Sequence, residues 1–248
     1  GGTPISDGPF RNGSMYLTYT NEGMPIGAFW GYKTDGLIQT QEQLNAVKRA
    51  DFQPNAELGD VLFVDTNGDG KLDSSDRCMI GNPIPDIIYG INMGMAWKGF
   101  DLNLQFGGTI GNQIFNAMRY YTYFPNDITN KDRALMNYWT PNNTNTDIPR
   151  LTATDVNDND RFSDMYVENG TYFRLRNAQL GYTLPASLTQ RIKLQKVRFY
   201  VSGQNLFTIS SYSGMDPEVG QSSSLSRGID YGIYPQNISF TGGINVTF

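Results

Sequence analysis

The sequence predicts an all-β protein made of the long antiparallel strands of a transmembrane β-barrel. Three observations predict this class. Apolar and polar residues alternate over several stretches, which is typical of strands with two different faces. These stretches run for about 9–13 residues, the length that a tilted strand needs to cross a bilayer. The connections between them alternate between short and long, as they do in bacterial barrels with short turns on one side and long loops on the other.

The most regular alternation lies in residues 238–248, where six apolar or glycine positions, ending in Phe248, alternate with polar residues. Residues 197–205 repeat the pattern, with Val197, Phe199 and Val201 on one face. Since strand side chains point alternately to opposite faces, both segments are predicted to be strands with one apolar face.

A hairpin is predicted further back, because residues 89–97 and 100–106 both alternate and only Lys98-Gly99 separates them. Residues 171–184 predict a fifth strand. Residues 14–20 and 26–33 are weaker candidates for additional strands. Five to seven strands cannot enclose a wide channel, so we expect the remaining strands to come from elsewhere.

Connection lengths assign the loops to the two sides of the membrane. Residues 108–170 and 208–235 are predicted to be long extracellular loops, and the short turns then lie on the periplasmic side. We expect residues 1–86 to hold barrel strands and a long extracellular loop, and residues 87–248 to hold the terminal barrel strands. Together they form one barrel domain that is incomplete alone.

Composition excludes several classes of protein. The 248 residues carry a net charge of −5 and have no basic stripe, so we expect no nucleic-acid partner. There is no histidine and one cysteine, Cys78, which excludes an internal disulfide and the commonest general base. A mean hydropathy of −0.43 is too low for a bundle of membrane helices. The first residues do not read as a secretory signal, so we expect a piece of a longer exported protein.

An Asp-rich segment predicts a cation site. Its oxygen-bearing side chains follow the spacing of a calcium loop at positions 1, 3, 5, 9 and 12, with Gly70 at position 6. The predicted ligands are Asp65, Asn67, Asp69, the Lys71 carbonyl, Asp73 and Asp76. Ca²⁺ is favoured over Mg²⁺ because many carboxylates in a flexible loop suit the larger ion. The alternative is a tight Asp/Asn/Gly turn held by side-chain to backbone hydrogen bonds.

The predicted loop 108–170 is rich in aromatic residues that could stack on sugar rings or anchor a partner protein. These are Tyr120, Tyr121, Tyr123, Phe124, Tyr138 and Trp139. For any one of them, packing within the loop is the stronger expectation. The same loop carries Asp155, Asp158 and Asp160, which could in principle hydrolyse a glycan. Because they lie in an Asn/Asp-rich run, we expect a solvated loop instead and no enzyme.

Several segments together resemble the SusC/RagA-type TonB-dependent outer-membrane transporters of Bacteroidetes. The resemblance covers essentially the whole chain and depends on the order and spacing of its motifs. They are Glu22-Gly23-Met24-Pro25-Ile26-Gly27, Phe29-Trp30-Gly31-Tyr32, Asp35-Gly36, Gly59-Asp60, Asp65-Thr66-Asn67-Gly68-Asp69-Gly70-Lys71-Leu72-Asp73, Gly81-Asn82-Pro83-Ile84-Pro85, Tyr89-Gly90, Trp97-Lys98-Gly99-Phe100-Asp101-Leu102, Tyr172-Phe173-Arg174-Leu175-Arg176-Asn177, Leu180-Gly181-Tyr182-Thr183-Leu184-Pro185, Gly203-Gln204-Asn205-Leu206-Phe207 and the terminal Phe248. Phe240, Ile244, Val246 and Phe248 also resemble the C-terminal signal that the barrel-assembly machinery recognises.

The resemblance implies the C-terminal barrel part of an outer-membrane transporter whose plug, TonB box and earlier strands are absent from this sequence. Such transporters import glycans or peptides together with a SusD-like surface lipoprotein, and TonB supplies the energy. Outer-membrane lipid would surround the barrel. The resemblance therefore predicts a transport protein, not an enzyme.

Two other classes of protein compete with this interpretation. The Asp65–Asp76 loop and the aromatic residues would also suit a soluble calcium-binding β-sandwich that binds carbohydrate. That protein would fold in water as a monomer. A glycoside hydrolase would turn over substrate with this chain alone, but the sequence contains no matching active site.

Overall fold

A computed structural model of the chain describes residues 4–6, 10–12, 15–123, 130–220 and 224–248. The chain divides into two compact units. Unit 1 comprises residues 1–84, 113–168 and 219–233. Unit 2 comprises residues 85–112, 169–218 and 234–248. The prediction that residues 1–86 and 87–248 belong to one barrel domain is not tested by this division and stays a prediction.

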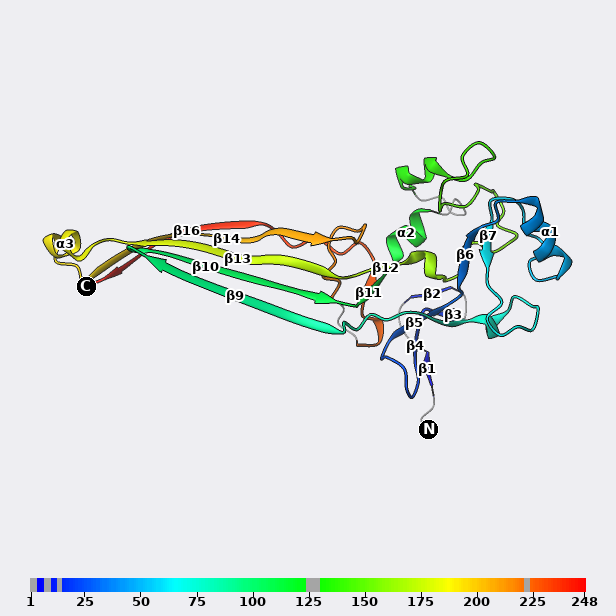
Figure 1. Ribbon diagram of the computed structural model, residues 1–248, viewed down its shortest axis with the longest axis horizontal. Coiled ribbons are helices and arrows are strands. Elements are labelled where there is room, and N and C mark those ends of the chain that lie inside the picture. Colours follow the sequence, from blue (N-terminus) through cyan, green and yellow to red (C-terminus); the bar gives the residue numbers. More distant parts are fainter. Residues whose placement is uncertain (1–3, 7–9, 13–14, 124–129, 221–223) are drawn as a thin grey trace. The chain divides into compact units, whose positions relative to one another are not determined.

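Unit 2 consists mainly of one antiparallel sheet with the strand order β16-β14-β13-β10-β9 (Figure 1). Its strands are β9 (Ile87–Trp97), β10 (Phe100–Ile110), β13 (Tyr172–Thr183), β14 (Lys196–Ser210) and β16 (Ser239–Thr247). They have 11, 11, 12, 15 and 9 residues. The five strands predicted from alternation are therefore confirmed, and β14 is longer than expected.

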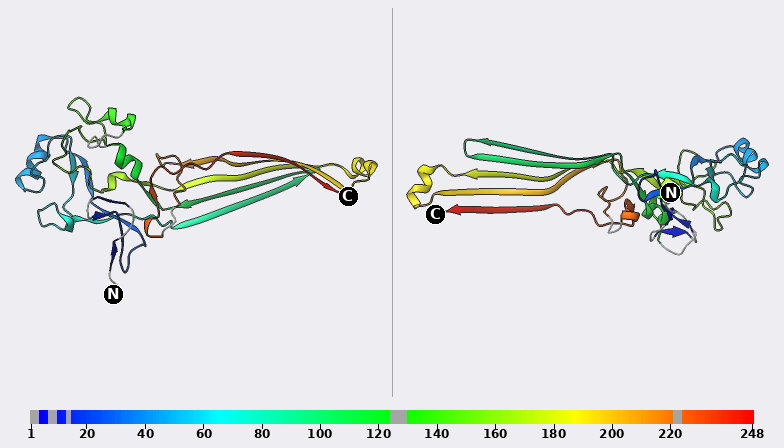
Figure 2. Two further views of the ribbon diagram at one scale, coloured as in Figure 1. Left: turned by 180° about the vertical axis from the view of Figure 1, so that it is seen from behind. Right: turned by 90° about the horizontal axis from the view of Figure 1, so that it is seen from below.

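The predicted hairpin between β9 and β10 is also confirmed. Lys98 and Gly99 have φ values of 46° and 87°. A two-residue turn that matches the twist of its strands needs positive φ at both positions, which explains the glycine. This turn, the chain end after β16, and the connection between β13 and β14 lie at the same end of the sheet (Figures 1 and 2). That connection holds α3 (Ala186–Thr189) and the 3-10 turn η4 (Gln190–Ile192).

Unit 1 contains short strands in small sheets. One sheet joins β1 (Ile5–Ser6), β4 (Thr18–Thr20), β5 (Ala28–Gly31) and β8 (Cys78–Gly81). Two strand pairs are β2 (Arg11–Asn12) with β3 (Met15–Tyr16) and β6 (Thr34–Leu37) with β7 (Val61–Phe63). A three-stranded sheet joins β12 (Val167–Asn169), β11 (Gln113–Asn116) and β15 (Ile229–Asp230), and β11 runs parallel to β15.

The helical elements of unit 1 are short. They are α1 (Gln41–Arg49), α2 (Ala117–Thr122), η1 (Ser74–Asp76), η2 (Arg133–Asn137), η3 (Asp164–Tyr166) and η5 (Ser224–Ser226). Helix α1 begins where Thr40 and Gln43 form a reciprocal capping box, which satisfies backbone amides that the first turn leaves free. Within the described ranges, no helix has both the length and the apolar character needed to cross a membrane.

The two weaker strand candidates differ from the expectation. Residues 14–20 and 26–33 do contain strands, namely β3, β4 and β5, but β4 and β5 pair with β1, β8 and each other. They add nothing to the sheet of unit 2. Strand β5 has only four residues and is buried or half-buried at all of them, so it lacks the alternation of the long strands.

Unit 1 is also where the described hydrophobic core lies. The largest cluster of buried apolar residues is built around Phe29, Phe115 and Tyr166. A second cluster packs Val61 and Phe63 against Trp139. A third, smaller cluster lies under α1. Every buried residue in these three clusters belongs to unit 1, so the apolar residues of the long strands form no comparable core.

Candidate functional site

The sheet of unit 2 has one apolar face whose side chains are exposed. The strand register aligns these side chains in rows that cross all five strands. Three such rows are Trp97–Phe100–Tyr182–Phe199–Ile244, Met95–Leu102–Leu180–Val201–Gly242 and Met93–Leu104–Ala178–Gly203–Phe240. Met95, Val201 and Phe240 expose 65%, 60% and 79% of their surface. An apolar surface of this extent is rare on soluble monomers and marks contact with a membrane or a partner.

The opposite face of the same sheet is polar. Its rows are Ala96–Asp101–Gly181–Tyr200–Gly243, Gly94–Asn103–Gln179–Ser202–Thr241 and Asn92–Gln105–Asn177–Gln204–Ser239. Arg198 reaches across β13 to Asp101, with Nε donating to Oδ1 at 2.9 Å. A Cβ at Gly181 would collide with both side chains, so this glycine makes the ion pair possible. The polar face thus suits a water-filled interior.

Two irregularities in the sheet concentrate charge at one place on the polar face. The register of β13 slips between Leu175 and Asn177 against both neighbouring strands, which leaves Arg176 as an extra residue. On β14, Asn205 adopts the left-handed conformation with a φ of 53°. Such bulges re-aim side chains. Here they place Arg176 and Arg174 side by side above the sheet.

The result is an arginine cluster formed by Arg174, Arg176, Asp216, Glu218 and Tyr172. Arg174 is nearly inaccessible, and its Nη1 lies 2.8 Å from Glu218. Arg176 donates to the other Glu218 oxygen at 3.0 Å and to the Tyr172 hydroxyl at 3.2 Å. The Tyr172 side chain is buried in this cluster on the polar face.

Asp216 fixes this cluster to the segments that follow β14 and precede β16. Burial favours the neutral acid, but amides of Gln236 and Glu218 and the Arg174 guanidinium donate to the carboxylate. The hydrogen bonds outweigh the effect of burial and hold the pKa of Asp216 below its ordinary value. The carboxylate is therefore charged at neutral pH, and it ties residues 216–218 and 236 to the sheet.

Two glycines of β10 let groups from the neighbouring strands approach its backbone closely. A Cβ at Gly107 would lie 2.6 Å from Nε of Arg176. A Cβ at Gly108 would collide with the Tyr172 carbonyl and with the hydroxyl of Tyr89. That hydroxyl donates to the Tyr172 carbonyl at 3.0 Å. Strand β10 therefore needs two consecutive glycines, because groups of the neighbouring strands approach its backbone closely at these positions.

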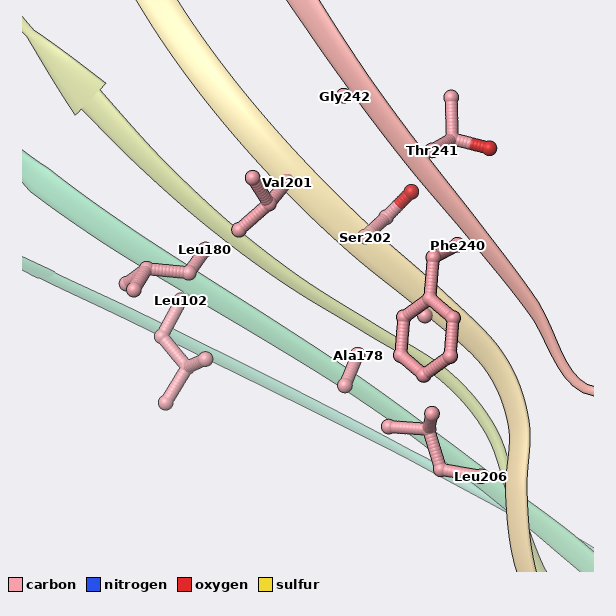
Figure 3. A pocket seen from close by; sticks show the side chains of 10 residues that line it. Leu102, Ala178, Leu180, Val201, Ser202, Leu206, Phe240, Thr241 and Gly242 are labelled. Atoms are coloured by element: carbon pink, nitrogen blue, oxygen red, sulfur yellow. The ribbon is translucent and has the colours of Figure 1, made fainter.

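The apolar face contains a groove with a volume of about 400 Å³ (Figure 3). It lies beside Ala178, Gly203 and Gly242, whose side chains are small or absent. Phe240 and Leu206 point toward each other at one end of it (Figure 3). The groove is lined by Leu102, Ala178, Leu180, Val201, Ser202, Gly203, Leu206, Phe240, Thr241 and Gly242.

The four residues predicted to form a barrel-assembly signal lie at the edge of the sheet. Phe240, Ile244, Val246 and Phe248 expose 79%, 61%, 43% and 84% of their surface. Strand β16 is paired on one side only among the described strands, with β14. The residues are therefore accessible to another protein, and their role in assembly stays a prediction.

The predicted cation ligands lie in a loop whose side chains bind its own backbone. Asp65 accepts hydrogen bonds from the amides of Gly70 and Gly68 at 2.8 and 2.6 Å, which lower its pKa. Asp76 is buried and accepts from the amides of Thr66 and Asp73, both at 3.0 Å.

The other predicted ligands are bonded in the same way. Asn67 accepts from the Asp69 amide, Asp69 from the Lys71 amide and Asp73 from the Ser75 amide. Within the described part of the chain, no three acidic, cysteine or histidine side chains are grouped to hold a metal ion. Calcium binding stays a prediction.

The aromatic residues predicted for ligand or partner contact are divided between core and surface. Tyr120 packs among Phe10, Phe162 and Tyr166. Trp139 is only 6% exposed, and its indole donates to Gln39 at 2.8 Å.

The remaining predicted aromatics lie nearer the surface. Tyr123 and Tyr138 are half-buried, whereas Tyr121 is 48% exposed. Phe124 lies outside the described residues. Tyr121 is thus the most accessible of the five described candidates.

The Asp155–Asp160 run is less solvated than its composition predicts. Asn157 and Asn159 are buried, and Asn159 donates to both Asp60 and Asp155 at 3.1 and 3.0 Å. Burial and the nearby Asp160 carboxylate raise the pKa of Asp155 to about 6. Of the three aspartates, only Asp158 is exposed, and it pairs with Arg161. The network joins this run to β7, because Asn159 also accepts from the Val61 amide.

Comparison with known proteins gives one consistent family. The chain is 39% identical over 237 residues to TonB-dependent receptor P3 of Formosa agariphila, which covers 92% of this chain and 22% of that receptor. It is 29% identical over 198 residues to TonB-dependent receptor SusC of Bacteroides thetaiotaomicron, which covers 79% of this chain and 18% of that receptor. No protein-family model matches.

Solved structures agree with these relatives. The RagAB peptide transporter superposes with a TM-score of 0.70 and 25% identity over 94% of this chain and 24% of that one. The RagAB peptide importer in its open-open state gives the same TM-score over 96% of this chain and 24% of that chain. The chain thus spans about a fifth to a quarter of the proteins it matches. With its all-β sheet and one exposed apolar face, the chain belongs to the SusC/RagA-type family of TonB-dependent receptors.

Proposed function

We propose that this chain forms part of the barrel wall of a TonB-dependent outer-membrane transporter for nutrient uptake. The observation that carries the proposal is the contrast between the two faces of the unit 2 sheet. Apolar side chains such as Met95 and Phe240 are exposed at 65% and 79%, while the opposite face carries ion pairs and amides. Lipid on one side and a wet lumen on the other would satisfy both faces at once.

The edges of the sheet support the same role. Among the described strands, β9 pairs only with β10, and β16 pairs only with β14. Unpaired edges of eleven and nine residues would be aggregation sites in a free-standing soluble domain. In a barrel, the rest of the transporter chain would pair with both edges and remove them.

The substrate we propose is an oligosaccharide or a peptide. RagAB is described as a peptide transporter and superposes on this chain, which supports a peptide. The resemblance to SusC-type transporters supports a glycan as well. It also supports a SusD-like surface lipoprotein as partner and TonB as the source of energy. Tyr121, with its 48% exposed ring, is our candidate in this chain for contact with the substrate or the lipoprotein.

The test uses the full-length transporter in its own host. We expect a tagged protein to fractionate with the outer membrane, to migrate differently on gels before and after heating, and to retain a lipoprotein through detergent purification. Deletion of the gene should abolish uptake of labelled oligosaccharides or labelled oligopeptides, and the class that is lost identifies the substrate. A tagged protein recovered in the soluble fraction would instead favour the calcium-binding β-sandwich.

Tyr121→Ala tests the contact residue in the same strain. Uptake should fall while outer-membrane yield and heat-dependent migration stay at the wild-type level. Tyr138→Ala, at a half-buried aromatic residue predicted from the same loop, is the matched control. Equal uptake by the Tyr121 variant and the wild type would remove Tyr121 from the site and leave the transport proposal standing.

A further inference from the structure

The end of the unit 2 sheet that carries the Lys98-Gly99 turn combines positive charge with apolar surface. We propose that this end binds an anionic phospholipid. Its headgroup would lie on a cationic rim formed by Lys98, Arg191 and Lys193, and one acyl chain would lie in the apolar groove on the same sheet. The inference rests on the proposed membrane-spanning role of the sheet.

The rim runs against the charge of the chain as a whole. The chain carries a net charge of −5, yet residues 184–198 contain four cations and no acid. One of these cations, Arg198, is neutralised by Asp101. Lys196, two residues before Arg198 on β14, lies on the same polar face. The three side chains of the cationic rim are exposed, and among the described residues none of them forms an ion pair. Their charge is therefore available to an external anion.

Backbone hydrogen bonds bring the cationic rim together. The amide of Thr183 donates to the Gly99 carbonyl at 2.7 Å, which holds the turn with Lys98 beside β13. Leu184 donates to the Val197 carbonyl at 2.9 Å, which holds β13 beside the start of β14. The turn that carries Lys98 thus lies one strand spacing, or about 5 Å, from the start of the connection that carries Arg191 and Lys193. The turn η4 and Lys193 lie on the connection that leads directly into β14.

Aromatic and apolar side chains place the cationic rim at the level of lipid headgroups. Trp97 is 69% exposed beside Lys98, whose ammonium lies 4.8 Å from the centre of the indole ring. Leu188 of α3 is 50% exposed, just before the cations of the same connection. Tryptophan and long basic side chains both favour the boundary between hydrocarbon and water.

The apolar groove lies at the depth of an acyl chain that hangs from this rim. Leu102, which lines the groove, follows Lys98 by four residues, or about 13 Å along the strand. One leaflet of a bilayer contributes about 15 Å of hydrocarbon. The groove is therefore reached by the tail of a lipid whose headgroup contacts Lys98. Gly242 leaves space in which that tail would pack (Figure 3).

Charge and shape together select the ligand. A phosphate with net negative charge complements three unpaired cations, whereas a zwitterionic headgroup brings its own cation and gains less. Free phosphate would use the cationic rim but not the groove. A diacyl anionic phospholipid such as phosphatidylglycerol uses both.

The experiment is native mass spectrometry of the detergent-purified full-length transporter. Phosphatidylglycerol and phosphatidylethanolamine with identical acyl chains are titrated separately. We expect phosphatidylglycerol to bind at least about tenfold more tightly than phosphatidylethanolamine. Its binding should weaken as added salt screens the charges of the rim. Equal binding of the two lipids would overturn the proposal. So would full displacement of phosphatidylglycerol by millimolar inorganic phosphate, because the acyl chain would then contribute nothing.

Two variants test the two halves of the site. The triple variant K98Q/R191Q/K193Q should lose the preference for phosphatidylglycerol. Its matched control, K33Q/K48Q/R49Q, removes the same charge from exposed positions in unit 1 and should keep that preference. Gly242→Leu fills the groove at a position where a Cβ meets nothing closer than 3.9 Å, and it should weaken phosphatidylglycerol binding several-fold. Gly90→Leu, at an equally open glycine on the polar face, should leave phosphatidylglycerol binding unchanged. Wild-type affinity in either test variant would contradict the proposal.

Fractionation separates this inference from the proposed function. A wild-type transporter that lies in the outer membrane but shows no lipid preference contradicts the lipid site alone. A wild-type protein that is absent from the outer membrane contradicts the proposed function. Variants are scored only when their migration on gels still depends on heating, which reports a folded barrel.

Discussion

Arg174 and Asp216 form a buried ion pair on the polar face of the unit 2 sheet. Their Nη2 and Oδ1 atoms lie 2.5 Å apart, and the two side chains are 3% and 6% exposed. The residues are 42 positions apart in sequence. The pair therefore joins a strand, β13, to the segment that follows β14.

Removing the charge of Asp216 should destabilise the protein. Asp216→Asn leaves the buried Arg174 guanidinium with Glu218 as its one carboxylate partner among the described residues, and we expect a loss of roughly 2–3 kcal/mol in unfolding free energy. Glu218→Gln is the matched control. That carboxylate is 35% exposed, so its loss should cost no more than about 1 kcal/mol. Thermal unfolding of the full-length transporter in detergent, followed by gel migration, measures both. Equal effects would mean that the buried pair does not anchor the segment.

The glycine at position 108 should be irreplaceable by alanine. A Cβ there would collide with the backbone carbonyl of Tyr172, which cannot move without shifting β13. We expect Gly108→Ala to cost about 1–3 kcal/mol, as overpacking does in close-packed proteins. Gly90→Ala places a Cβ 3.8 Å from its nearest neighbour and should change stability by less than about 1 kcal/mol. Unfolding of the two variants in parallel decides the point, and equal stability would contradict the close approach at Gly108.

The stability of unit 1 should fall as the pH rises from about 4 to about 6. The pKa of Asp155 is raised from 3.8 to about 6 in the folded chain, so the folded state holds the proton that the unfolded state has released. This stabilisation is complete below pH 3.8 and is lost as the pH passes 6. Hydrogen exchange of residues 155–160 in the full-length protein, followed across this pH range, measures the change in stability. Asp155→Asn should flatten the pH dependence, and an unchanged slope in that variant would show that another group titrates.

Calcium should stabilise the full-length protein through residues 65–76. Loops of this spacing in extracellular modules have dissociation constants of about 10⁻⁴–10⁻³ M, so 10 mM Ca²⁺ should add about 1.4–2.7 kcal/mol. A double variant, Asp65→Asn with Asp69→Asn, should lose the effect, since it removes two of the predicted ligand charges. Asp51→Asn, outside the loop, is the control. Calorimetry with Ca²⁺ and Mg²⁺ tests this, and a wild-type protein indifferent to Ca²⁺ would leave the loop as a turn held by its own hydrogen bonds.

The long strands can be located from the sequence because their two faces meet different surroundings. The alternation around Val201 and Phe240 is a local property, and so is the turn chemistry of Lys98-Gly99. The bulge at Arg176 cannot be found in this way, since an extra residue in one strand is defined only against its partner. Nor can Arg174 be paired with Asp216, because nothing in the local pattern links them.

The surroundings of the candidate site residues are hidden from the sequence for a similar reason. The sequence makes Trp139 a candidate for ligand contact, but it packs against Gly59, which has no side chain to prevent the approach. Composition predicts a solvated loop around Asp155, but Asn159 ties it to the buried Asp60. Composition reports the polarity of a segment, whereas burial depends on which distant residues fold over it.

The central claim is that one face of the unit 2 sheet contacts lipid and the other contacts water. Single cysteines placed in a cysteine-free full-length transporter test it most directly. Leu180→Cys and Val201→Cys probe the apolar face, and the adjacent Gln179→Cys and Ser202→Cys probe the polar face. In outer-membrane preparations, we predict that the first pair reacts with a lipid-soluble maleimide and not with a charged one, and that the second pair reacts with the charged reagent. Labelling of the two apolar-face variants by the charged reagent at the rate of the polar-face pair would contradict the claim.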